Sequence, residues 1–446
     1  EDATTIAQEY LVEQKTAAGE GEEVANIEGI KKLGDYEVEI TTDGFSATTI
    51  YNLGVIVEPM HYYGDASLYD YDNNQFGFTR GDLSSVRDKA SQPLGAGPYK
   101  FVKYENKTVY LEANENYYKG APKIKYLQWR ETSDADKIAG VEQGTIDLSD
   151  PSGSKSAFDQ IKSINSNGEL DGDKIMVNAT DNLGYGYIGI NSNTVNVGGD
   201  AGSDASKNLR KAIATVLAVY RDVAIDSYYG DAASVINYPI SNTSWAAPQK
   251  SDADYQAAYS VDVDGNALYT DDMSDDEKFA AATQAALGFF EAAGYTVEDG
   301  KVTAAPEGAK MTYEIIIGAD GSGDHPSFAI LTDAKAALES IGFTLEINDV
   351  TDSNIMWDAL NAGTAEMWAA AWQATVDPDM YQVYHSASVK SNYYHINDET
   401  LDQDIIDARS TADQEYRKSV YKQCLDIILD WAVEIPVYQR QNCIIY

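Results

Sequence analysis

The chain has 446 residues, 43% of them hydrophobic, which is enough for two or three lobes with buried cores. It carries 72 acidic residues against 32 Lys and Arg, a formal net charge of −40. Such a surface repels phosphate backbones and anionic lipid headgroups, so binding to nucleic acid or to a membrane surface is not expected. No apolar run approaches the roughly 18 residues that a membrane span needs. The only two cysteines, Cys424 and Cys443, are too few for a disulfide framework and are expected to be small buried residues.

The first third of the chain carries strand patterns. Residues 36–40 alternate apolar and charged side chains ahead of a turn at Asp43-Gly44, within a segment from 27 to 59 that we expect to form paired strands. Further strand-like segments lie between residues 97 and 129, separated by turn-forming residues. This part is therefore predicted to be an α+β lobe rich in antiparallel strands.

After Asp204 the hydrophobic period changes from strand to helix. Apolar residues recur every three or four positions and line one helical face: Leu209, Ala212, Ile213, Val216 and Leu217. Farther along, Ser274 and Glu277 have the capping-box pattern that opens a helix, which is expected to end at Gly294 before a strand. The same order of helix, glycine and strand recurs at 334–347, which predicts an α/β lobe.

The segment from Gly184 to Gly189 has the glycine spacing of a dinucleotide-binding turn. In that motif the glycines let the backbone approach a pyrophosphate at a helix N-terminus. Here the last glycine leads into a strand and turn at residues 190–193, so the required helix is missing and we expect no nucleotide site. No Gly-x-Ser-x-Gly nucleophile elbow occurs either.

Candidate metal ligands are sparse. The four histidines are scattered, without a two-histidine spacing around a carboxylate: His61, His325, His385 and His395. His325, at the mouth of a predicted helix, is instead a candidate ligand contact. Residues 260–271 place Asp262 and Asp264 as a calcium loop would, but the segment starts with Ser and lacks the final Glu, which favours an acidic turn over calcium binding. We therefore assign no catalytic residue, metal ligand or cofactor.

The densest aromatic cluster lies at residues 367–386, where an apolar strand runs into an acidic Pro turn. Amphipathic aromatic side chains combine rigid contact area with hydrogen bonds, which suits a ligand cleft. Core packing is the alternative explanation. We predict that the cluster faces a ligand through Trp368, Trp372, Thr375, Asp377 and Tyr381.

Several short motifs follow one another along the chain. They begin with Gly95-Ala-Gly-Pro-Tyr99 and continue with Leu111-Glu-Ala-Asn-Glu-Asn-Tyr-Tyr118. Later stretches lie at 142–147, 187–191, 208–222, 289–295 and 435–438. In this order they resemble the extracellular solute-binding proteins of peptide, dipeptide and nickel ABC importers (family 5, oligopeptide-binding type), and the resemblance covers nearly the whole chain.

The resemblance implies an α/β, periplasmic-binding-protein-like type II (class C) fold with two lobes that close around a ligand, and a small extra α+β lobe. By position, residues 1–123 are expected to form the small extra lobe, 124–207 part of lobe I, 208–435 lobe III, and 436–446 a return to lobe I. The opening strands of lobe I, the signal peptide and the lipidated cysteine have no counterpart here. The N-terminal part of lobe I is therefore expected to be missing.

The resemblance also implies how a ligand is held. Peptide-binding members grip extended backbone through main-chain hydrogen bonds, and the Asp of their Trp-x-Ala-Asp-Tyr motif holds the ligand's terminal ammonium. The matching segment here is Trp372-Gln-Ala-Thr375-Val, so Thr375 replaces that Asp and Asp377 is the nearest substitute. Asn191, after the matching strand, is expected to clamp ligand backbone, with Tyr187 beside it.

These features predict a binding receptor and not an enzyme. We expect the substrate-binding component of an ABC importer, which captures peptides or oligopeptides outside the cell and delivers them to permease subunits. One alternative is the same fold binding an oligosaccharide or another small solute, because the tryptophans also suit stacking on sugar faces. A cell-surface hydrolase, which needs paired carboxylates, is the second alternative. The expected protein is a monomer, periplasmic or a cell-surface lipoprotein, and meets the membrane only through a lipid anchor absent from this chain.

Overall fold

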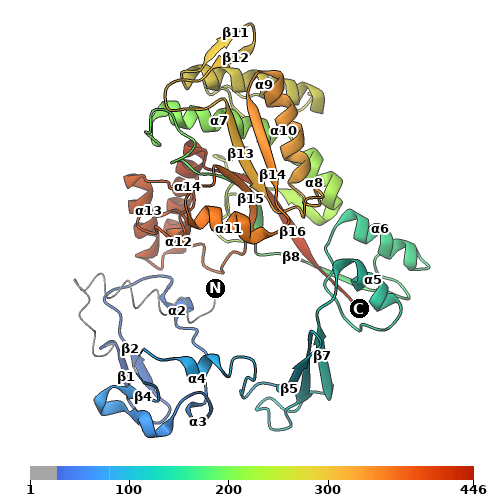
Figure 1. Cartoon of the computed structure of the whole chain (residues 1–446), viewed down its shortest axis with the longest axis vertical. Coiled ribbons are helices and arrows are strands. Elements are labelled where there is room, and N and C mark those ends of the chain that lie inside the picture. The colour runs from blue at the N-terminus through green and yellow to red at the C-terminus, as the bar shows by residue number, and fades with distance from the viewer. Residues whose placement is uncertain (1–27, 80) are drawn as a thin grey trace. The chain divides into compact units, whose positions relative to one another are not determined.

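The computed structural model describes residues 28–79 and 81–446 (Figure 1). By their contacts these residues divide into two units: 28–45 with 52–132, the N-terminal unit, and 46–51 with 133–446, the C-terminal unit. None of the helices described combines the length and the apolar character that crossing a membrane requires. This division does not test the predicted lobe boundaries at 123/124, 207/208 and 435/436, which stay predictions.

Short elements make up the N-terminal unit. Strands β5, β6 and β7 form an antiparallel sheet in which Tyr99 lies opposite Ala113 and Thr108 opposite Arg130. This confirms the strand prediction for residues 97–129, and a β1–β2 ladder confirms paired strands near residues 36–40. The elements are β1 (Ile30–Lys32), β2 (Val38–Ile40), α3 (Met60–Tyr63), β3 (Tyr69–Asp70), β4 (Gln75–Phe76), α4 (Ser84–Arg87), β5 (Tyr99–Glu105), β6 (Thr108–Ala113) and β7 (Tyr126–Arg130). The short helix α2 (Thr49–Asn52) belongs to the C-terminal unit except for Asn52.

The C-terminal unit alternates helices and strands as the sequence predicts. Its elements are α5 (Asp134–Glu142), α6 (Lys155–Ile164), β8 (Val177–Asp181), β9 (Tyr185–Ile190), α7 (Asp204–Val219), α8 (Arg221–Tyr229), β10 (Ala233–Val235), α9 (Asp275–Ala292), β11 (Thr296–Glu298), β12 (Lys301–Ala304), β13 (Thr312–Ile317), α10 (Phe328–Ser340), β14 (Thr344–Asp349), α11 (Ser353–Asn361), β15 (Met367–Trp372), α12 (Tyr381–Tyr384), α13 (Glu399–Arg409), α14 (Gln414–Trp431) and β16 (Glu434–Ile445).

One mixed sheet organises this unit. Its strand order is β10-β16-β9-β15-β13-β14, and β8 also pairs with the long strand β16. β13 runs parallel to β14 and β15, whereas the other pairs are antiparallel. Strands from both sides of residue 207 therefore share one sheet, in which β9 lies between β15 and the C-terminal strand β16.

Local signals account for the helices that cover this sheet. In α9 the Ser274 side chain accepts from the Glu277 N–H, and the Glu277 carboxylate accepts from the Ser274 N–H, which confirms the predicted capping box. The helix ends where Gly294 takes a φ of +89°, a conformation that glycine adopts without a Cβ clash. The predicted helix after Asp204 is α7, and Cys424 and Cys443 are buried as expected.

Alternate residues of the central strands enter different cores. Ile188, Met367 and Ala369 belong to the cluster that includes residues of α7, α9 and α10. Tyr187 and Trp368 belong to a second cluster, which includes residues of α11, α13 and α14. Because successive strand side chains point to opposite faces, β9 and β15 are buried on both sides of the sheet. Of the residues in these two strands, only Ala371 and Trp372 at the end of β15 are not buried.

Candidate functional site

Two glycines of β9 lie against large rings of the neighbouring strands β15 and β16. Trp368 pairs with Gly189, and a Cβ built on Gly189 would lie 2.3 Å from the Trp368 indole. A Cβ on Gly186 would lie 2.1 Å from the Tyr438 ring of β16. These positions therefore have to be glycine for the rings to fit. The glycine spacing that resembles a nucleotide-binding motif therefore serves ring packing within a strand.

The end of β15 has an open edge. β9 pairs with β15 along its whole length to Trp372, whereas β13 pairs with it only from Met367 to Ala369. Among the described residues, no strand continues the ladder beside Ala370, Ala371 and Trp372 on the β13 side. Their main-chain groups on that side can accept an added extended segment.

An aromatic layer supports this open end. The Trp372 ring stacks on Tyr187 at 5.4 Å between ring centroids and 5° between planes. The Trp372 Nε1 donates to the Tyr394 hydroxyl at 3.1 Å, and Trp368 Nε1 donates to the Tyr187 hydroxyl at 3.1 Å. Trp372 is half-buried, but Tyr187 and Trp368 have no exposed surface. The buried rings therefore fix the orientation of the one that is accessible.

Glu434 lies beneath this layer as a fully buried carboxyl group. Its Oε2 accepts from the Tyr384 hydroxyl at 2.7 Å and also from the Tyr394 hydroxyl. Burial raises the pKa of Glu434 to about 7, although the tyrosine hydrogen bonds act in the opposite direction. Sequence reasoning missed this residue; the available signal was a single charge inside the apolar run of residues 431–438.

The turn after β15 holds an ion pair instead of a free carboxylate. Arg417 Nη2 donates to both oxygens of Asp377, at 2.8 and 3.0 Å, and to the Tyr421 hydroxyl at 2.9 Å. Asp377 and Arg417 are each only 6% exposed. Thr375 is exposed, and its hydroxyl donates to the Asp377 carbonyl oxygen at 2.7 Å. The charge of Asp377 is therefore already balanced within the protein.

Tyr381 lies on the other side of the same turn, at the start of α12. Its ring packs against the Arg409 guanidinium, whose carbon is 4.4 Å from the ring centroid, and against the His385 ring at 4.3 Å. Arg409 in turn pairs with Asp379 at 3.3 Å. Tyr381 is half-buried, so part of its ring is accessible beside the turn.

The other residues predicted to contact a ligand, Asn191 and His325, form hydrogen bonds within the protein. Asn191 is 1% exposed, and its Nδ2 donates to the carbonyls of Ala365 at 2.9 Å and Gly363 at 3.3 Å. His325 accepts at Nδ1 from the Ser327 N–H at 3.0 Å, and burial lowers its pKa to about 4. None of the described contacts joins His325 to the aromatic layer. The ligand role predicted for these two residues stays a prediction.

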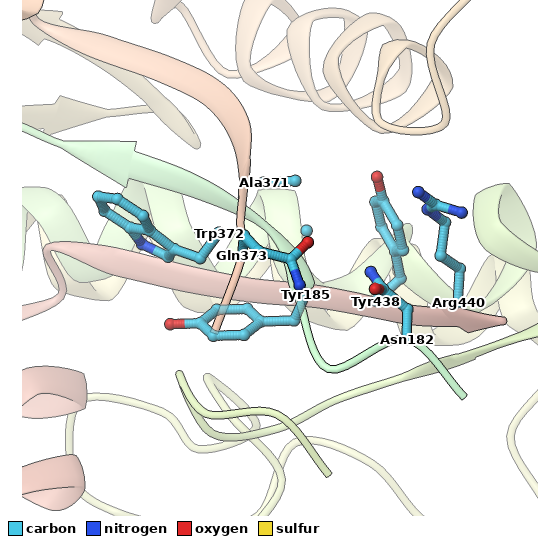
Figure 2. Close-up of a pocket in the computed structure, with 8 residues that line it drawn as sticks. Asn182, Tyr185, Ala371, Trp372, Gln373, Tyr438 and Arg440 are labelled. Carbon is cyan, nitrogen blue, oxygen red and sulfur yellow. The ribbon is translucent and has the colours of Figure 1, made fainter. Parts of the chain in front are cut away.

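A cavity of about 140 Å³ opens where β9, β15 and β16 meet (Figure 2). Its wall consists of Asn182, Tyr185, Gly186, Ala371, Trp372, Gln373, Tyr438 and Arg440. Ala371 and Trp372 at the end of β15 therefore form part of its wall, together with the cationic side chain of Arg440. Gln373, Tyr438 and Arg440 were not predicted as site residues.

No cluster of three or more His, Cys, Asp or Glu side chains suited to a metal ion occurs in residues 28–79 and 81–446. In the segment that resembles a calcium loop, Asp262 Oδ1 accepts from the N–H groups of Asp264 and Asn266, as in an acidic turn. Calcium binding at 260–271 stays open.

The chain is similar to several known proteins. The oligopeptide-binding protein AppA of Bacillus subtilis is 22% identical over 407 residues, which cover 89% of this chain and 64% of that protein. This chain thus spans about two-thirds of its relative's length. The solved structure of lactococcal OppA with an endogenous peptide matches at a TM-score of 0.69, with 16% identity over 95% of this chain and 73% of that one.

NikZ from Campylobacter jejuni, solved with Ni(L-His), matches at a TM-score of 0.66, with 18% identity over 94% of this chain and 72% of that one. These likenesses show that the chain has the mixed α/β, periplasmic-binding-protein-like fold. The family profile for bacterial extracellular solute-binding proteins, family 5, matches residues 4–394. The chain therefore belongs to family 5 of the bacterial extracellular solute-binding proteins.

Proposed function

We propose that this protein is the solute-binding component of an ABC importer, which captures peptides outside the cell and delivers them to permease subunits. The open edge of β15, whose residues Ala371 and Trp372 also line the cavity, carries this proposal. An extended peptide can add to such an edge through main-chain hydrogen bonds, which do not depend on its side chains. The adjacent Trp372 offers an oriented ring for one side chain of the peptide.

The amino end of the peptide is held without an ion pair to Asp377. Arg417 already occupies both carboxylate oxygens of Asp377, and breaking a buried pair leaves an uncompensated charge. The Thr375 hydroxyl supplies no charge. Backbone carbonyl groups of the β15 end are therefore the proposed acceptors for the ligand's ammonium group.

A binding role also fits the chemistry of the buried groups better than hydrolysis does. Glycoside hydrolysis needs two carboxyl groups facing one bond. Here Glu434 is fully buried beneath tyrosines and Asp377 is paired with Arg417. An oligosaccharide is the second candidate ligand, because the half-buried Trp372 ring can stack on a sugar face. The open strand edge favours the peptide.

We further propose that the protein works as an extracellular monomer, either in the periplasm or held at the cell surface by a lipid anchor outside this chain. The family to which it belongs supports an extracellular place. Its net charge of −40 supports a soluble receptor that self-association does not favour.

Titration calorimetry with a mixture of short peptides and, separately, with oligosaccharides tests the proposal. Trp372→Ala should weaken peptide binding about thirtyfold, since an aromatic contact of this kind contributes about 2 kcal/mol. Trp357→Ala is the matched control, because Trp357 of α11 is half-buried outside the cavity wall. Equal peptide affinity in both folded variants would move the site away from β15, and binding of sugars alone would refute the peptide assignment.

A further inference from the structure

Arg440 differs from the other described arginines of the C-terminal unit in having no strong internal partner. Arg210 and Arg221 donate to backbone carbonyls. Arg409 and Arg417 pair with aspartates. Within the described residues, no carboxylate lies within 4.0 Å of the Arg440 guanidinium. Its Nη1 makes two long hydrogen bonds, at 3.4 Å to the Gln441 carbonyl and 3.3 Å to Asn442 Oδ1.

The backbone fixes this cation at the cavity. Arg440 lies opposite Ala233 in the β10–β16 ladder, and its carbonyl accepts from the Asn182 N–H at 3.0 Å. Its side chain stands beside the Tyr438 ring, and the Gln373 and Asn182 amides lie at the same cavity (Figure 2). The main chain of Arg440 is therefore held at the cavity wall, and its guanidinium extends from there beside the Tyr438 ring (Figure 2).

No acid among the described residues forms an ion pair with Arg440. Asp181 of the neighbouring strand β8 accepts from Gln441 Nε2 at 3.2 Å instead. The chain has more than two acidic residues for each basic one, 72 against 32. A surface arginine in such a chain has many carboxylates to choose from, so an unpaired one at a cavity is a notable exception.

We infer that the cavity between β9, β15 and β16 binds a carboxylate group of the ligand through Arg440. A guanidinium binds a carboxylate through two parallel N–H bonds, and the amides of Gln373 and Asn182 and the Tyr438 hydroxyl add neutral donors around it. This inference rests on the proposed peptide function and narrows its ligand class. The carboxylate comes either from the C-terminus of a short peptide or from an Asp or Glu side chain.

Titration calorimetry with three synthetic tetrapeptides tests the inference: tetra-alanine with a free C-terminus, its C-terminal amide, and the amide with one Ala replaced by Glu. The variants are Arg440→Gln and Lys335→Gln, a matched loss of one positive charge on α10 away from the cavity. Thermal unfolding checks that both variants are folded.

Arg440→Gln should weaken the carboxylate-bearing peptide ten- to a hundredfold and leave the uncharged-end amide unchanged, whereas Lys335→Gln should change neither. Preference for the free C-terminus identifies the terminal carboxylate, and preference for the Glu amide identifies the side chain. Equal affinities in Arg440→Gln and wild type, or equal losses for all three peptides, would overturn the carboxylate subsite while peptide binding stands. If wild type bound none of the peptides, the peptide function would fail and the subsite with it.

Discussion

Two arginines near the end of β15 have opposite surroundings. Arg417 has a side chain that is 7% exposed and holds Asp377 by two hydrogen bonds. Arg440 lines a cavity, and the described residues place no carboxylate within reach of it. Since acidic residues are abundant in this chain, the difference comes from local geometry and not from a shortage of partners. Arg417 stabilises the turn, and Arg440 is free for a ligand.

The largest expected effect on stability comes from breaking the buried ion pair between Asp377 and Arg417. Asp377→Ala leaves the Arg417 charge buried without a partner, which should lower the free energy of unfolding by about 3–5 kcal/mol. Arg440→Gln should change it by no more than about 0.5 kcal/mol, because that side chain has no strong partner to lose. Urea unfolding followed by tryptophan fluorescence measures both. A small loss in Asp377→Ala would mean that Asp377 is available to a ligand ammonium after all.

Glu434 extends the comparison to a buried carboxyl group that accepts hydrogen bonds from tyrosine hydroxyl groups and has no cation as a partner. Its pKa is raised from 4.5 in the unfolded chain to about 7 in the folded protein, so the folded state binds the proton more tightly. The contribution of Glu434 to the free energy of unfolding is therefore lost as the pH rises from 4.5 to 7, by on the order of 3 kcal/mol. This contribution does not change further above that range.

Comparing wild type with Glu434→Gln isolates this effect, since other carboxyl groups titrate in both proteins. The variant should gain stability relative to wild type as the pH rises through this range. Unfolding free energies measured at several pH values give the difference. A difference that is independent of pH would place the Glu434 pKa outside the range.

A smaller effect is expected where β9 supports the cavity. Gly186→Ala puts a Cβ 2.1 Å from the Tyr438 ring, and such overpacking costs about 1–3 kcal/mol. Gly288→Ala in α9 is the control, because its Cβ would meet Val263 at an ordinary 3.5 Å and should stabilise the helix by about 0.5–1 kcal/mol. Thermal unfolding compares them, and equal melting temperatures would show that the Tyr438 ring moves without cost.

Local signals in the sequence predicted much of the fold. Hydrophobic period, capping residues and terminating glycines act within a few residues of each other, which is why α7, α9 and the strand β15 were found. The order of short motifs predicted the family. The apolar run indicated a strand at Trp368, but the sequence analysis did not show that both faces of that strand are covered.

The chemistry of the site depends on contacts between distant residues. Asp377 meets a partner 40 positions away. β16 brings Glu434 beside Gly189 of β9 and Arg440 beside Asn182, each across more than 240 residues. No pattern within one segment reports such pairing. The sequence therefore indicated where the aromatic cluster lies, and the register of β9, β15 and β16 decided which side chains are paired, buried or open.

Native mass spectrometry of the purified protein tests the central claim most directly, followed by release and identification of any molecule that it retains. The account predicts a series of peptide masses whose members carry a free carboxylate, as strand addition at β15 and the Arg440 cavity require. A single sugar or metal adduct, with no peptide, would contradict it.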